Sequence, residues 1–366
     1  MTRLPGRRAR RRVLAAVAAV ALAAVTALAG ALMPVGGGGR AGAAGGAGVA
    51  DPAGRAVVTG RAAGRAPALS RVLAGALAVR PAAVRAASAA PAGSAGSAAS
   101  AVGVPAAPPG WSTVFADGFN GPAGSAPSSS WRYVAGPAVV FGNGEVETLT
   151  GSTRTAYLDG HGDLDITARE HDGRWTSARI QTVSPDVGAP PGGKLEVVAS
   201  IEQPGPADGL GYWPAFWMLG PGPWPEHGEI DILEDVNALS EHSGTLHCGI
   251  RDGGPCRETF GMVSGLLPCP GCQTTYHTYA VIIDRADAAD ESVTWYLDGR
   301  PFYRVTEDQV GAGPWRAAVD HDFWIILDLA IGGAYPDGAC GCTTPSAGTT
   351  PAATMRVAYV AAYRTG

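Results

Sequence analysis

GEIDILE, residues 228–234, sets three carboxylates among three large aliphatic side chains. Apolar alternation of this kind predicts a β-strand, in which successive side chains point to opposite faces. Glu229 and Asp231 then share one face, while Ile230 and Ile232 share the other and point toward a core. Acids inside such a strand repel one another and resist loss of water, so their presence needs a reason.

The end of the same stretch breaks the alternation. Strict alternation would place Leu233 on the acid face and bury Glu234, and both placements are costly. One extra residue near Ile232-Leu233, a β-bulge, resets the phase. We therefore predict a bulged strand in which Glu234 joins Glu229 on a solvent-facing surface and Leu233 turns inward.

Three acids on one open surface have a chemical use. Cleavage of a glycosidic bond with retention needs one carboxylate and one carboxylic acid, about 5–5.5 Å apart. We predict Glu229 as the nucleophile, Glu234 as the general acid and then base, and Asp231 as the orienting middle acid. An ionised neighbour raises the pKa of the group that must stay protonated. A solvated acidic face and a metal site remain alternative interpretations of the pattern.

The surrounding 256 residues, 111–366, carry short apolar or alternating runs such as 164–168, 194–200 and 279–283. Turn signals separate these runs, among them Asp172-Gly173 and Asp298-Gly299. No amphipathic helix of 12 or more residues is evident. The pattern predicts an all-β domain, a sandwich of two antiparallel sheets.

The N-terminal part has a different composition. Basic residues 7–12 precede an uncharged run, residues 13–35, which predicts a signal peptide; retention of that run as a membrane anchor stays open. Residues 36–110 contain no aromatic side chain and predict a disordered Ala/Gly/Arg/Pro-rich linker. All nine tryptophans lie from Trp111 onward. We predict a secreted protein, with cell-surface anchoring as the alternative, whose catalytic domain spans 111–366.

Charge separates the two parts as well. Residues 1–110 hold 13 arginines and one acid, Asp51, a charge of +12. The overall net charge of −5 therefore leaves −17 for residues 111–366. So acidic a domain argues against nucleic acid as a partner. A neutral polysaccharide is compatible with it, and we expect a monomer.

Six cysteines in an exported chain predict disulfides. Bridges 248–256 and 269–272 are the easiest to close, whereas a bridge between Cys340 and Cys342 would make a tight ring. Fifteen full pairings are allowed, so the connectivity stays open. A zinc knuckle at Cys269-Pro-Gly-Cys272 lacks a convincing second pair of ligands. We predict no metal and no cofactor.

At these residues the sequence resembles glycoside hydrolase family 16. GEIDILE matches the signature Glu-x-Asp-x-x-Glu of its bulged, laminarinase-type form. Further segments follow in the order expected for that family; they are GNGEVET (142–148), TSARIQT (176–182), GYWPAFWMLG (211–220), GTLHCG (244–249), HTYAV (277–281), WYLDG (295–299) and LAIGG (329–333). The resemblance covers essentially 111–366.

The resemblance implies a concanavalin-like β-jelly-roll with a cleft on the concave face. It also implies retaining endo-hydrolysis of a β-linked polysaccharide, with β-1,3-glucan as the first candidate. Galactan and mixed-linkage glucan are the alternative substrates. A non-catalytic carbohydrate-binding protein is the competing class, although a pure binder needs neither Glu229 nor Glu234.

Three positions depart from the family pattern. Gly118 and Ala358 stand where two acids usually help to bind a structural calcium ion. Since hard cations need oxygen ligands, we predict no calcium there. Asp328 stands where laminarinase-like members usually have Asn, and we expect it to alter sugar contacts or the pH optimum.

Several side chains are candidates for substrate contact. Indole rings offer flat apolar area to the C–H faces of sugars, while an amide, a guanidinium and an imidazole offer hydrogen bonds to hydroxyls. Core packing, a turn role, a surface ion pair and a satisfied structural histidine are the respective alternatives. The candidates are Trp213, Trp217, Arg179, Asn143 and His247. We expect Trp224 to pack in a loop.

Overall fold

The structure is a computed structural model that describes residues 103–366. The predicted signal or anchor (1–35) and nearly all of the predicted linker (36–110) lie outside the described residues. No helix within 103–366 is long and apolar enough to cross a membrane.

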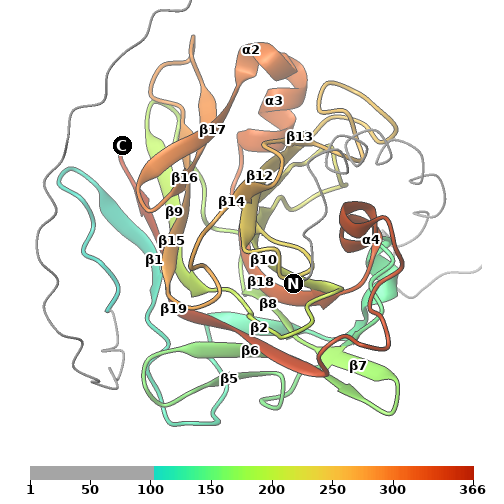
Figure 1. Cartoon of the computed structure of the whole chain (residues 1–366). Coiled ribbons are helices and arrows are strands. Elements are labelled where there is room, and N and C mark those ends of the chain that lie inside the picture. The colour runs from blue at the N-terminus through green and yellow to red at the C-terminus, as the bar shows by residue number, and fades with distance from the viewer. Residues whose placement is uncertain (1–102) are drawn as a thin grey trace, which may run out of the picture. The chain divides into compact units, whose positions relative to one another are not determined.

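Two sheets make up the described part of the chain (Figure 1). The larger has eleven strands in residues 103–366. Its spatial order is β17 (Arg300–Thr306), β16 (Ser292–Leu297), β15 (His277–Asp284), β9 (Lys194–Glu202), β19 (Ala352–Arg364), β6 (Leu164–His171), β7 (Arg174–Ser177), β4 (Thr148–Leu149) and β3 (Gly136–Pro137), with β1 (Ser112–Asp117) on β19 and β5 (Ala156–Leu158) on β6.

The smaller sheet has eight strands among the same residues. Its order is β13 (Met262–Val263), β12 (Glu241–His247), β11 (Glu229–Glu234), β10 (Tyr212–Leu219), β18 (Trp324–Ile331), β8 (Arg179–Thr182) and β2 (Trp131–Val134), with β14 (Leu267–Pro268) on β12. The strand pairs are antiparallel except for β4 with β7, which run parallel. The predicted all-β sandwich is therefore confirmed.

Helices are short and lie outside the sheets in the described part of the chain (Figure 1). They are the 3-10 helix η1 (Ala138–Phe141) and the α-helices α2 (Glu307–Val310), α3 (Ala312–Val319) and α4 (Ala334–Cys340). The predicted absence of a long amphipathic helix agrees with these lengths.

The core lies between the sheets and follows from the period of two in each strand. In the smaller sheet Phe216 and Ile230 point inward, and in the larger sheet Val197 and Val281 do so, all without exposed surface. Burial of such side chains contributes about 1.5–3 kcal/mol each. Alternate residues of the smaller sheet therefore point away from the core, onto a surface that we call the acid face because it carries the acids of β11.

The predicted bulge in β11 is confirmed. Asp231 pairs with Thr245 and Glu234 with Ser243, so β11 advances by three residues while β12 advances by two. The pairing of β11 with β10 shifts at the same place. Ile232 and Leu233 are both fully buried in the core. The extra residue lets two consecutive aliphatic side chains enter the core and returns the next acid to the acid face.

A tryptophan from the opposite sheet supports the bulge. A bulge disrupts the ladder locally, and a buried carbonyl beside it needs a partner. The Trp295 indole of β16 donates a hydrogen bond of 2.7 Å to the Asp231 carbonyl oxygen. Gly244 lies across from the bulge in β12, and a Cβ there would be 2.4 Å from Trp295 Cδ1. The missing side chain of Gly244 makes the room that Trp295 occupies.

This packing predicts the effect of adding one methyl group. We expect Gly244→Ala to lower the free energy of unfolding by about 1–3 kcal/mol, because the new Cβ must displace the indole or the strand. The matched control is Gly313→Ala in α3, where a Cβ meets open space, so that only a small change in stability is expected. Denaturant unfolding measures both. Equal stability of Gly244→Ala and the parent protein would contradict the account of the bulge.

Candidate active site

Glu229, Asp231 and Glu234 of β11 lie along the acid face, as the predicted bulge requires. The Trp213 indole of β10 donates a hydrogen bond of 3.1 Å to Glu234 Oε1. The Thr245 hydroxyl of β12 lies 3.5 Å from Glu234 Oε2. Both contacts come from strands that flank β11, so the bulged acid is held from two sides.

His247 of β12 faces the other end of the acid row. Its Nε2 lies 3.4 Å from Asp231 Oδ2 and 3.8 Å from Glu229 Oε1. Register explains the approach, because Glu229 pairs directly with His247 across the two strands. The structure therefore brings this predicted residue together with two of the three predicted acids.

Burial raises the pKa of all three acids, and neighbouring charges modify each shift differently. Burial, followed by the charges of Glu234 and Glu229, raises the pKa of Asp231 well above its usual range. Burial raises the pKa of Glu234 to about 7. Burial also raises the pKa of Glu229, but the positive charges of His247 and Arg179 oppose that shift. His247 thus favours the ionised form of both glutamates and Arg179 that of Glu229, while Glu234 retains a proton up to near-neutral pH.

Trp217, Arg179 and Asp328 form the neighbouring part of the acid face. The Trp217 indole donates a hydrogen bond of 2.6 Å to Asp328 Oδ1. The Arg179 guanidinium lies 4.4 Å from the Trp217 ring centre and 4.7 Å from that of Phe141. Arg179 is nine-tenths buried, so the predicted alternative of a surface ion pair is wrong. Asp328 accepts a bond from an indole that could otherwise bind a sugar hydroxyl.

Asn143 lies in the loop between η1 and β4. Its side-chain amide donates a hydrogen bond of 3.4 Å to Glu145 Oε1, and its backbone carbonyl oxygen accepts one from the backbone N–H of Ala334. Burial raises the pKa of Glu145 to about 8, and the charges of Glu147 and Asp328 add to the shift. The loop is thus hydrogen-bonded to the start of α4, and the Asp328 charge acts on the Glu145 carboxyl in this loop. Substrate contact by Asn143 stays a prediction.

Trp224 packs at the His247 end of the acid row. Its ring centre lies 5.5 Å from that of His247. The Arg251 guanidinium lies 5.0 Å from the centre of the same Trp224 ring. The expected loop packing is therefore present, and it places an aromatic ring next to the site.

Sequence reasoning missed Tyr335 of α4. Its ring meets the Trp213 ring edge-on at 5.7 Å, and its hydroxyl lies 3.2 Å from the Ser243 hydroxyl. Burial, then the charge of Glu234, raises the pKa of Tyr335. Its position two residues after LAIGG was the one signal in the sequence. No periodicity or motif links Tyr335 to the residues of β10 or β12 that it contacts.

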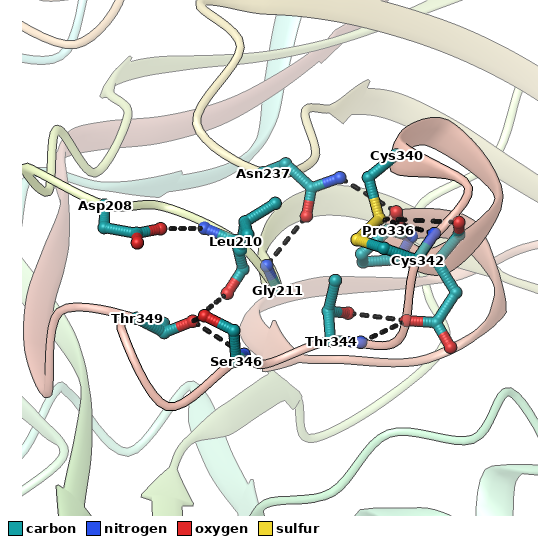
Figure 2. The surroundings of a disulfide bond; sticks show 11 residues. Asp208, Leu210, Gly211, Asn237, Pro336, Cys340, Cys342, Thr344, Ser346 and Thr349 are labelled. Atoms are coloured by element: carbon teal, nitrogen blue, oxygen red, sulfur yellow. Dashed lines mark hydrogen bonds between the residues drawn. A yellow bond between two sulfur atoms is a disulfide. The ribbon is translucent and has the colours of Figure 1, made fainter. Parts of the chain in front are cut away.

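The C-terminal end of α4 is tightly anchored (Figure 2). Asn237 donates a hydrogen bond of 2.8 Å to the Pro336 carbonyl oxygen, and Asp337 Oδ1 accepts bonds from the backbone and the hydroxyl of Thr344. Cys340 and Cys342 are disulfide-bonded with their Cα atoms 5.2 Å apart. The ring that seemed too tight thus does close, because the helix end brings the two residues within the usual Cα range.

The other two disulfides are 248–256 and 269–272, as predicted. Because Cys269 and Cys272 are bonded to each other, they cannot serve as thiolate ligands beside His277. Ligand atoms of Glu229, Asp231 and His247 also lie within 4.8 Å of one another, and we assign no metal to them. Ala358, at one of the two positions where family members usually bind calcium, is packed in an apolar cluster. The absence of a calcium site stays a prediction.

Comparisons with known proteins agree with this geometry. The matching family model is described as XgeA-like, catalytic GH16 domain, and covers residues 195–257. The endo-1,3-beta-glucanase structure from Streptomyces sioyaensis is 41% identical, with a TM-score of 0.68 over 72% of this chain and 99% of that chain. The Beta-glucanase of Rhodothermus marinus is 30% identical over 62% of this chain and 78% of that protein.

A third relative is longer than this chain. The Glucan endo-1,3-beta-glucosidase A1 of Niallia circulans is 31% identical over 72% of this chain, which spans only 39% of that protein. Together with the bulged acid row, these matches show that the chain belongs to glycoside hydrolase family 16, whose jelly-roll fold and glycosidase class it shares.

The contacts of Glu234 predict a shift in pH dependence. The Trp213 hydrogen bond lowers the pKa of Glu234 from where burial alone would set it. We expect Trp213→Phe to raise that pKa above about 7 and to move the basic limb of kcat/KM to higher pH. Trp217→Phe is the matched control, because its indole binds Asp328 and not Glu234. Identical basic limbs in the parent protein and Trp213→Phe would contradict this assignment.

Proposed function

We propose that this chain is a retaining endo-β-1,3-glucanase in which Glu229 is the nucleophile and Glu234 the acid/base. The observation that carries the proposal is the β11 bulge, which sets the two glutamates on one face in different electrostatic surroundings. The names of the relatives from Streptomyces sioyaensis and Niallia circulans support β-1,3-glucan as the substrate.

The first chemical step uses the difference between the glutamates. Glu229, favoured as a carboxylate by His247 and Arg179, attacks the anomeric carbon and forms a covalent glycosyl ester. Glu234, still protonated near neutral pH, gives its proton to the departing glycosidic oxygen. One bond forms to Glu229 as the bond to the leaving sugar breaks, and the released sugar takes the proton.

The second step reverses the proton's path. Glu234, now a carboxylate, removes a proton from water, and the oxygen displaces Glu229 from the anomeric carbon. Two inversions give net retention. Asp231 lies between the two glutamates and its raised pKa favours the protonated form, so it can donate a hydrogen bond to a neighbouring carboxylate. This is the orienting role proposed for it.

The polysaccharide would lie along the acid face. Trp213 and Trp217 of β10 are partly exposed on that face beside the acids, where each indole can cover one sugar ring. We propose that Arg179 and Asn143 bind hydroxyls. The Asp328 carboxylate holds the Trp217 indole nitrogen, so we propose that it fixes the ring that stacks on the sugar.

We further propose that the protein acts outside the cell. Basic residues 7–12 and the uncharged run 13–35 support export, with surface anchoring as the alternative. The three disulfides in the described domain fit an oxidising compartment.

Reducing-sugar release from laminarin, lichenan, galactan and agarose tests the proposal. We expect release from laminarin, and a loss of roughly 10³-fold or more in Glu229→Gln, whose amide cannot form the glycosyl ester. Glu196→Gln in β9 of the other sheet is the matched control and should retain activity. No release from any of the four by folded protein would favour carbohydrate binding over catalysis, and release from galactan or agarose alone would overturn the substrate.

A further inference from the structure

The loop that follows β12 brings a buried carboxylate to His247. The disulfide Cys248–Cys256 closes the first part of this loop. Gly253 and Glu258 then exchange two backbone hydrogen bonds of 2.7 and 2.8 Å. Glu258 is thereby fixed at the end of a short closed hairpin. Its side chain has no exposed surface.

Glu258 divides its two oxygens between two partners. Oε1 accepts a hydrogen bond of 2.9 Å from Cys248 N, and Oε2 lies 2.9 Å from His247 Nδ1. A carboxylate has acceptors only, so Nδ1 must carry the proton of that bond. Glu258 thus selects which imidazole nitrogen is protonated first and leaves Nε2 directed at the acid row.

The imidazole has little freedom to turn away. A Cβ at Gly261 would lie 3.0 Å from His247 Nδ1 and Cε1, so the backbone passes close against the ring. The Trp224 ring also lies beside the imidazole, with 5.5 Å between the two ring centres. The His247 side chain is only 13% exposed. Its orientation toward Asp231 and Glu229 is therefore built into the fold.

Charges around His247 favour its cationic form. Burial alone lowers the pKa of His247, but the Glu258 hydrogen bond and the charges of Glu229, Glu258 and Glu234 raise it above the usual value. The charged groups that act on Glu229 are the cations His247 and Arg179 and the acids Glu258 and Asp328. Asp231 and Glu234 lie on the same strand. A proton held on Nε2 therefore faces the proposed nucleophile as a fixed positive charge.

We propose that Glu258 is a positioning residue of this glycosidase: through its bond to Nδ1 it holds His247 so that Nε2 presents positive charge to Glu229 and Asp231. The proposal rests on the catalytic roles proposed above. It assigns Glu258 no contact with substrate; its positioning effect passes through one imidazole, and its own negative charge separately raises the pKa of Glu229.

The acid limb of kcat/KM against pH tests this role. Glu258→Gln offers one acceptor oxygen instead of two, so it cannot satisfy both Cys248 N and a protonated Nδ1. Loss of positive charge on His247 raises the pKa of Glu229, while loss of the Glu258 charge lowers that pKa by less, because His247 is the larger of the two influences. Glu229 should therefore hold its proton to higher pH. We expect the acid limb to move up by about one pH unit, which is about a tenfold loss of kcat/KM on its acid side. Wild-type and variant limbs that coincide would overturn the proposal.

A double-mutant cycle separates positioning from a purely structural role. If Glu258 acts through His247, adding Glu258→Gln to His247→Gln should not raise the acid limb above that of the single His247→Gln variant, because only the direct charge of Glu258, whose loss lowers the pKa of Glu229, is then removed. Additive shifts would overturn the proposal. Glu291→Gln is the matched control, because Glu291 is another buried acid with two side-chain donors, Arg285 and Trp315, and should leave the acid limb in place.

An NMR titration of the His247 ring protons distinguishes failure of this inference from failure of the proposed function. If the wild-type protein cleaves no glycan, the catalytic roles fail, but the His247 pKa must still fall in Glu258→Gln; an equal value in both proteins would overturn the positioning role. If Glu258→Gln does not fold, Glu258→Asp takes its place. Glu258→Asp keeps the negative charge but places it one methylene farther from His247. A lower His247 pKa supports the positioning role, and an unchanged pKa overturns it.

Discussion

The hydrogen bond from the Trp295 indole to the Asp231 carbonyl is the interaction on which the site depends. It joins the two sheets at the one place where the β11 ladder is irregular. Gly244 provides the space, and Ile232 and Leu233 fill the core beside it. Together these residues allow β11 to carry one residue more than its neighbours. Without that extra residue Glu234 would face the apolar interior, and the acid face would lose one of its two glutamates.

The acid face illustrates a trade between stability and function. Burial raises the pKa of Glu234 and Glu147 to about 7 and that of Glu145 to about 8. A carboxyl whose pKa is higher in the folded than in the unfolded chain stabilises the fold at low pH, and this contribution is lost as the pH rises through the raised pKa. At Glu234 this cost supports the proposed function, because glycoside cleavage needs two carboxyl groups of unlike proton affinity. His247 limits this cost at Glu234 and Arg179 limits it at Glu145, because their positive charges lower the pKa of those carboxyls.

The sequence was informative where the chemistry lies within one strand. The period of two, broken once in GEIDILE, was enough to predict the bulge, the sandwich and the common face of Glu229, Asp231 and Glu234. Pairing of adjacent strands then brought His247 to the acids, and the Trp213 indole of β10 binds Glu234. Two of the three disulfides are the bridges that spacing made easiest to close, although spacing left the connectivity open.

Residues that reach the site through loops could not be predicted in this way. Glu258 arrives on a disulfide-closed hairpin and Tyr335 on α4, and neither has a period or motif that links it to β11. The Cys340–Cys342 bridge was judged too tight because the geometry of the helix end was unknown. Arg179 was weighed against a surface ion pair because burial between Phe141 and Trp217 depends on the fold.

The central claim is that the bulge makes Glu229 and Glu234 a pair suited to double displacement. NMR observation of the anomeric proton of the first product released from a β-1,3-linked oligosaccharide tests it most directly. The account predicts that the β-anomer appears first and only later equilibrates with the α-anomer. If the α-anomer appeared first, the reaction would proceed by a single inversion, and the pairing of the two glutamates proposed here would be wrong.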